Sequence, residues 1–162
     1  MRKIYLFVLA LIFPVFVFSC GKEVKLYDIL ISVTADENSL PAGKIMCYGN
    51  IYEDSISEST LTEYLGLYNY PEFKDNIEEL CVYSSLKGDY CELALIKLYR
   101  VSDVHDAKLF FERRIKLTER TLNLSGKKGY AENAKIKIYG NIVVLYMMPD
   151  NSHFENKIKS KI

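Results

Sequence analysis

Glutamates and histidines are the first residues in this sequence that could do chemistry. Glu78 and Glu79 precede a Lys-Gly-Asp turn, and Glu92 follows it. Carboxylates that approach each other can divide general acid and general base work, so these three residues define a possible carboxylate site. Exposed strand positions are the commoner explanation for such residues, and we favour that interpretation. His105 lies in the first turn of a predicted helix and His153 in a polar tail, and we interpret both as solvated side chains.

Recognisable motifs for other chemistry do not occur in the sequence. It contains no nucleophile elbow, phosphate-binding loop or dinucleotide fingerprint. There is no C-x-x-C spacing and there are only 2 His, which argues against a zinc site. The 21 basic and 21 acidic residues give a formal charge of zero, so no bulk field recruits nucleic acid. We therefore predict no catalytic residues, no cofactor, no metal and no nucleic-acid partner, and we regard an enzyme as the less favoured class.

The N-terminal segment has the pattern of an export signal. Arg2 and Lys3 precede an uncharged apolar run from Ile4 to Phe18, and the small residue Ser19 follows it. As a helix this run would be about 22 Å long at roughly 1.5 Å per residue, which is shorter than a hydrocarbon core of roughly 30 Å. We therefore predict that residues 1–19 are a signal peptide that is removed, rather than a permanent membrane span.

The end of this segment, Val17-Phe18-Ser19-Cys20-Gly21, resembles a bacterial lipobox. The resemblance implies that the Cys20 thiol receives a diacylglyceryl group and that signal peptidase II cleaves before Cys20. Each buried methylene contributes about 0.8 kcal/mol, so two or three acyl chains would hold the protein firmly on the outer face of the cell membrane. Residues 20–25 would then form the lipid-anchored tether. The alternative is an ordinary secretory signal that leaves Cys20 as a free thiol.

Three cysteines remain beyond Cys20, and their odd number leaves at least one unpaired. A turn centred on Gly88 places Cys81 and Cys91 out of register in the predicted hairpin. A disulfide needs Cα atoms within about 7 Å, so we expect Cys47, Cys81 and Cys91 to include two or three buried free thiols. A bridge between Cys81 and Cys91 is the alternative.

Tyrosine is the unusual count, with 13 Tyr and no Trp. Five tyrosines cluster before the predicted central hairpin, and amphipathic tyrosines favour recognition surfaces. Half-buried packing positions explain most of them as well, so a tyrosine-lined binding surface is the less favoured of the two interpretations. The clustered residues are Tyr48, Tyr52, Tyr64, Tyr68 and Tyr70.

Hydrophobic periodicity predicts an alternation of helices and hairpins. The order is a helix over 26–33, a strand over 45–48, a helix over 60–67 capped by Ser59 or Thr60, paired strands over 77–85 and 91–100, a long helix from Ser102-Asp103 to Gly126, paired strands over 134–148 around Gly140-Asn141, and a polar C-terminal tail or helix over 151–162. We therefore predict a single α+β domain over 26–150, with an antiparallel sheet of about four or five strands and helices packed on one face.

This arrangement resembles a family of small lipoproteins, mainly of Gram-positive anaerobes, known only as domain of unknown function 4358. The residues that carry the resemblance are the lipobox, Ile77 to Tyr83, Glu92 to Lys97, the helix opened by Ser102-Asp103, Glu132 to Lys135, and Tyr139 to Leu145. The resemblance implies an extracytoplasmic lipoprotein and supplies no substrate. We expect a binding or structural module that recognises an envelope protein, peptide or wall component. The alternative is a small envelope hydrolase or transferase that uses the carboxylates.

Overall fold

The computed structural model describes residues 25–35, 37–126 and 129–162, so the predicted signal peptide and Cys20 lie outside the described residues. Within the described residues, four α-helices and four short 3-10 helices accompany five strands. The elements are α2 (Leu26–Thr34), β1 (Gly43–Tyr48), α3 (Glu58–Leu65), η2 (Leu67–Asn69), η3 (Pro71–Asn76), β2 (Ile77–Ser85), β3 (Glu92–Leu98), η4 (Val101–Asp103), α4 (Val104–Ser125), η5 (Ala131–Asn133), β4 (Lys135–Tyr139), β5 (Ile142–Met147) and α5 (Asn151–Lys159).

The strands form one open antiparallel sheet in the order β1-β2-β3-β5-β4, which confirms the predicted fold class. Both hairpins have the register that their turns predict. Cys81 faces Leu95 in the β2–β3 pair, and Ile138 faces Val143 in the β4–β5 pair. Gly140 has a φ of 59°, which a two-residue hairpin turn requires and which glycine adopts without strain.

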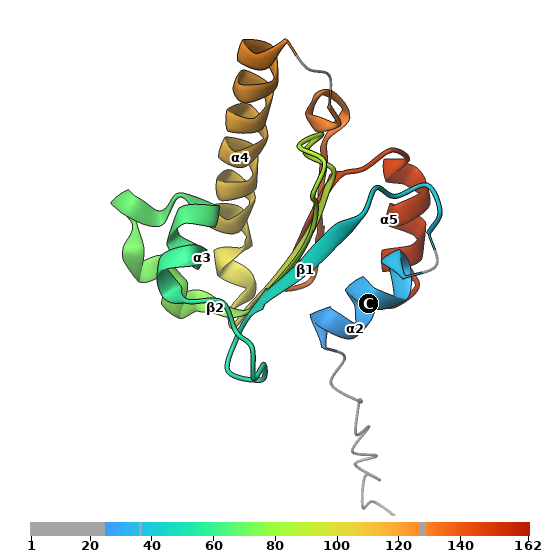
Figure 1. Cartoon of the computed structure of the whole chain (residues 1–162). Helices are drawn as coiled ribbons and strands as arrows, with labels where there is room; N and C mark the ends of the chain where they lie inside the picture. Colours follow the sequence, from blue (N-terminus) through green and yellow to red (C-terminus); the bar gives the residue numbers. More distant parts are fainter. Residues whose placement is uncertain (1–24, 36, 127–128) are drawn as a thin grey trace, which may run out of the picture.

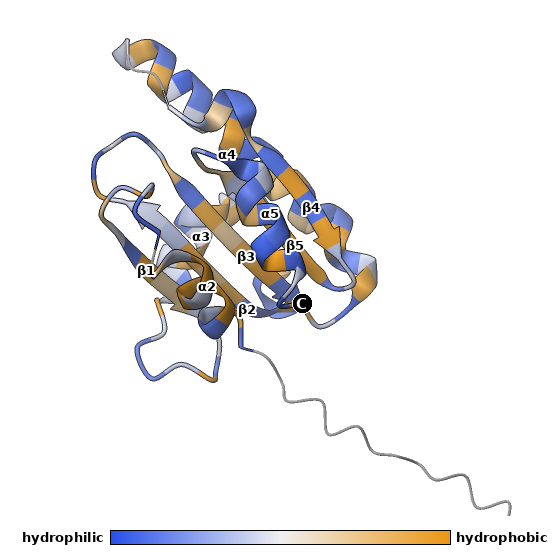
Figure 2. Cartoon of the chain, turned by 90° about the vertical axis from the view of Figure 1, so that its right-hand side faces the viewer, coloured by the Kyte–Doolittle hydropathy of each residue, from blue (hydrophilic) through white to orange (hydrophobic). Residues whose placement is uncertain are grey.

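Helices cover both faces of this sheet, whereas the sequence analysis placed them on one. Figure 1 shows α3 and α4 on one side and α2 with α5 on the other. The reason is that β3 and β5 are apolar at nearly every position, so both of their faces must be buried. Leu93 and Leu95 face α2 and α5, while Ala94 and Ile96 face α3 and α4. Figure 2 shows the same two strands in hydrophobic colours.

Local signals explain where the helices begin and end. Ser57 caps α3, because its hydroxyl accepts a hydrogen bond from the Thr60 backbone N–H at 3.2 Å, so the cap lies before the predicted Ser59 or Thr60. Gly126 ends α4 in the left-handed conformation, as predicted. Asp150 caps α5, whose Phe154 and Ile158 are buried, so this C-terminal segment is a helix that packs on the sheet.

Candidate functional site

Two of the three candidate glutamates are buried, each on a different face of the sheet. Glu92 begins β3 on the face covered by α3 and α4, and only 2% of it is exposed. Arg114 of α4 donates from Nε to Oε1 of Glu92 at 2.6 Å and forms an ion pair with Oε2 through a terminal nitrogen. Tyr64 of α3 donates its hydroxyl to Oε1 at 2.8 Å. Burial, followed by the negative charge of Glu92, raises the pKa of Tyr64.

Glu79 is the matching carboxylate on the opposite face, where it is also 2% exposed. Its Oε2 accepts hydrogen bonds from the backbone N–H of Leu26 and from the Tyr52 hydroxyl, both at 2.9 Å. The Lys97 ammonium lies 3.9 Å from the other oxygen. Burial and the hydrogen bond to Glu79 raise the pKa of Tyr52. Glu79 therefore fixes both the first turn of α2 and the Tyr52 side chain to the sheet.

Glu92 does not converge with the other two candidate carboxylates. Glu79 lies opposite Lys97 at one end of the β2–β3 hairpin, whereas Glu92 lies opposite Ser84 at the other. Glu78 is partly exposed and forms an ion pair with Lys97 at 2.6 Å. Our preferred interpretation of all three as exposed strand residues is wrong for Glu79 and Glu92. The alternative loses the pairing of Glu92 with the other two glutamates across the hairpin, and Glu78 and Glu79 both contact the Lys97 ammonium.

The cysteines form a bridge that the sequence analysis did not predict. Cys47 of β1 lies directly opposite Cys81 of β2, with 4.2 Å between their Cα atoms, and the two form a disulfide. Cys91 is the free cysteine of the described residues and is buried. Burial raises the pKa of its thiol to about 12. The expectation of free thiols therefore holds for Cys91 and is wrong for the other two, as is the alternative pairing of Cys81 with Cys91.

Cys47 of this disulfide lines a hollow beside the start of α2, which we call the α2 hollow. Its volume is about 530 Å³, and the Tyr27 and Tyr52 rings meet edge to face in it with centroids 6.3 Å apart. The lining residues are Tyr27, Ile45, Met46, Cys47, Ile51, Tyr52, Glu53, Asp54 and Ile56. Because the polar groups lie at Glu53 and Asp54 and the rest is apolar, this hollow suits an apolar group better than a charged anion.

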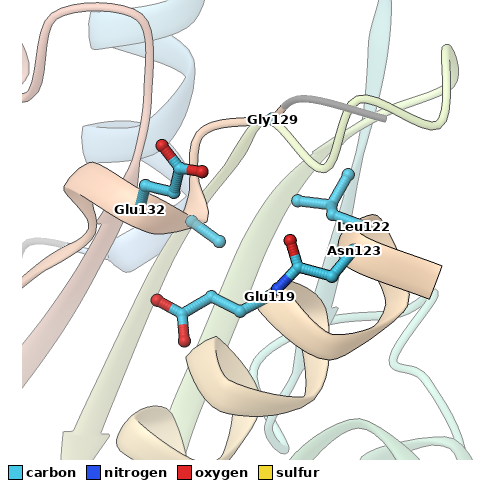
Figure 3. A pocket seen from close by; sticks show the side chains of 6 residues that line it. Glu119, Leu122, Asn123, Gly129 and Glu132 are labelled. Carbon is cyan, nitrogen blue, oxygen red and sulfur yellow. The ribbon is translucent and has the colours of Figure 1, made fainter. Parts of the chain in front are cut away.

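A second pocket of about 260 Å³ lies between α4 and η5 and contains two further carboxylates, from Glu119 and Glu132. Figure 3 shows these side chains on different walls, with their carboxylates pointing in different directions. Leu122 and Ala131 supply the apolar part of the lining. This pocket therefore does not provide the facing acid and base that the sequence candidates fail to form.

The histidines lie far from both pockets. His105 is exposed in the first turn of α4. His153 of α5 approaches the Glu37 carboxylate at 3.0 Å, and Lys157 reaches the same carboxylate oxygen at 2.6 Å. These contacts tie α5 to the segment after α2. Across residues 25–35, 37–126 and 129–162, no group of three or more His, Cys, Asp or Glu side chains could hold a metal ion.

The five clustered tyrosines do not share one surface. Tyr52 belongs to the α2 hollow, and Tyr64 is held inside by Glu92. Tyr70 packs on Phe110, with ring centroids 6.4 Å apart, while Tyr68 is 71% exposed. The clustered tyrosines therefore fit the favoured interpretation, as packing residues, better than the interpretation as one binding surface.

The outward-facing side of α4 carries three exposed leucines among basic residues. We call the residues concerned the α4 outer face, and they are Leu109, Arg113, Lys116, Leu117, Arg120 and Leu124. At roughly 100° per residue these positions fall within an arc of about 100°. Leu117 is 62% and Leu124 81% exposed. None of the three basic side chains forms a salt bridge with another described residue.

The sequence analysis did not predict the α4 outer face, because it considered only the core-facing positions of the helix. The available signal was a second stripe in which leucines alternate with basic residues, which is typical of an interaction surface. The end of α4 projects beyond the sheet in Figures 1 and 2, which leaves the last part of the stripe uncovered.

Comparisons with known proteins give no further assignment. No family model, curated protein or solved structure matches this chain. Among the described residues, no helix combines the length and the apolar character that a membrane span requires.

Proposed function

We propose that this chain is a lipid-anchored extracytoplasmic module that is tethered through Cys20 and binds a partner at the cell envelope. The observation that carries the proposal is the disulfide between Cys47 and Cys81. Structural disulfides persist in oxidising compartments and are rare in the cytosol. This argument is independent of the N-terminal signal, and both lead to the same location. Membership of the lipoprotein family that the sequence resembles is part of the same proposal.

The partner that best fits the α4 outer face is a protein or peptide segment with acidic and apolar side chains. Leu117 and Leu124 offer apolar area, while Arg113 and Arg120 offer charge without an internal counterion. Complementary charge steers such an encounter, and burial of the leucines would hold the complex. A binding role also agrees with the glutamates, because Glu79 and Glu92 are engaged in bonds that hold the fold together.

The anchor is tested by mass spectrometry of protein extracted from membranes. We expect an N-terminus at Cys20 with added acyl mass, and we expect Cys20→Ser to abolish both the cleavage and the added mass. Cys91→Ala is the matched control, because it also removes one thiol and should leave the lipidation unchanged. An unmodified Cys20 in the wild-type protein would overturn the proposal.

The binding surface is tested by charge reversal in cells. Arg113→Glu with Arg120→Glu should abolish crosslinking of the anchored protein to its envelope partner. Lys44→Glu with Lys87→Glu makes the same change in net charge on exposed residues outside the α4 outer face and should preserve crosslinking. Equal loss in both variants would assign the effect to net charge and refute the role of the α4 outer face.

A further inference from the structure

We infer that the apolar rim around the α2 hollow rests on the surface of the membrane that holds the lipid anchor. This rim consists of Tyr27 and Ile51, which line the hollow, and of Ile31, which lies one turn after Tyr27 on α2. The inference rests on the proposed lipidation of Cys20, and it adds a second, non-covalent contact with the same bilayer.

The length of the tether places this rim close to the bilayer. Six peptide units connect Cys20 to Leu26, and at about 3.3 to 3.6 Å each they span at most roughly 20 Å. Leu26 is fully buried, and its N–H is held by the Glu79 carboxylate at 2.9 Å. The start of α2 is thus fixed to the sheet, and the side of the domain that bears α2 must lie near the headgroups.

The chemistry of the rim suits the interfacial region. Tyr27 is 40%, Ile31 36% and Ile51 45% exposed. A tyrosine ring with its hydroxyl is favoured at the boundary between apolar and polar layers, where the isoleucines also lose contact with water. Spacing of four residues puts Tyr27 and Ile31 on the same side of α2.

The charges beside the rim determine which type of lipid headgroup the rim can contact. Asp28 on α2 and Glu53 with Asp54 at the hollow outnumber the cation Lys25 at the start of α2, so anionic headgroups would repel this region. We therefore assign the contact to zwitterionic headgroups, at shallow depth. Because α4 covers the opposite face of the sheet in Figure 1, this orientation directs the α4 outer face away from the bilayer.

The test uses the absence of tryptophan from the natural chain. Tyr27→Trp and Ile51→Trp each place one tryptophan on the rim, and Leu124→Trp places one at the exposed end of α4 as a matched control. The mature lipidated proteins are reconstituted into phosphatidylcholine vesicles with and without brominated acyl chains. We expect bromine to quench the emission of both rim tryptophans and to leave Leu124→Trp unchanged.

Flotation of the same vesicles separates failure of the anchor from failure of the contact. Protein that does not float with the vesicles would overturn the lipid anchor, and the contact with it. Protein that floats while both rim tryptophans stay unquenched would leave the anchor standing and refute the contact. Quenching of Leu124→Trp as strong as that of the rim variants would also refute it, because the domain would then have no fixed orientation.

Discussion

Each face of the sheet buries one glutamate of the β2–β3 hairpin, and the two carboxylates have different hydrogen-bond and ion-pair partners. Glu92 meets a guanidinium and a phenol contributed by α4 and α3. Glu79 meets a backbone N–H and a phenol, with Lys97 at 3.9 Å. The first arrangement joins two helices to the sheet through a buried ion pair. The second joins the beginning of the domain to the sheet mainly through neutral donors.

Because of this difference, removing a bonding partner of the buried glutamate should destabilise the two faces by different amounts. A buried charge that loses its counterion keeps the full cost of desolvation, whereas one that loses a neutral donor loses a hydrogen bond. The face with α3 and α4 should therefore be more sensitive to single substitutions in its polar network. The face with α2 and α5 has the Cys47–Cys81 bridge as an additional constraint.

Removal of the Arg114 guanidinium should cause the largest loss of stability. Arg114→Met leaves Glu92 buried without its cation, which should lower the free energy of unfolding by about 3 to 5 kcal/mol in urea titrations. Combining Arg114→Met with Glu92→Leu removes both charges and should restore most of that loss. If the double variant is no more stable than the single one, the ion pair is not the source of the sensitivity.

Loss of the disulfide should have the next largest effect. Replacing Cys47 and Cys81 with alanine frees a loop of sequence separation 34 and should cost about 2 to 4 kcal/mol. Chemical reduction of the wild-type protein should reproduce the loss, while reduction of the double variant should change nothing. Reduction that leaves the wild-type unfolding curve unmoved would contradict a structural role for this bridge.

Replacement of the other glutamate should be milder. Glu79→Leu leaves the Leu26 N–H and the Tyr52 hydroxyl without their acceptor and should cost about 1 to 3 kcal/mol. Hydrogen exchange should show the loss in the first turn of α2, with β5 still protected. Glu79→Gln keeps one acceptor oxygen and should cost less. A loss equal to that of Arg114→Met would erase the contrast between the two faces.

The smallest expected change in stability concerns Glu37, at the exposed end of the face with α2 and α5. Hydrogen bonds from Lys157 and then His153 lower the pKa of Glu37 from 4.5 to about 2. Because the folded pKa is lower than the unfolded one, this stabilisation is present above pH 4.5 and is lost as the pH falls towards about 2. Wild type should therefore lose more stability than Glu37→Gln across that window. Parallel stability curves for the two proteins would contradict the shift.

Features determined by neighbouring residues were predictable from the sequence. Gly140-Asn141 set the register of the β4–β5 hairpin, and Gly88 set that of β2 and β3. Ser102-Asp103 and Gly126 marked the two ends of α4. In each case the signal and the structure that it specifies lie within a few residues or one helix, so no knowledge of distant contacts was needed.

Features that depend on distant partners were not predictable. β1 pairs with β2 across a long connection that contains α3, so no turn defined the register that brings Cys47 to Cys81. The burial of Glu92 depends on Arg114, 22 residues away, and on Tyr64, 28 residues away. Without those partners an isolated glutamate in a strand is best interpreted as exposed, which is why the interpretation failed.

The position of the free cysteine has a consequence for oxidative folding. Closing the short loop between Cys81 and Cys91 costs about 1 kcal/mol less entropy than closing the loop of 34 between Cys47 and Cys81. We therefore expect an early, non-native Cys81–Cys91 bridge in the unfolded chain, which must rearrange by thiol exchange. Once β2 and β3 pair, Cys81 faces Leu95 and Cys91 is fully buried. The folded domain thus keeps away from solvent the Cys91 thiol, which could otherwise reverse the exchange.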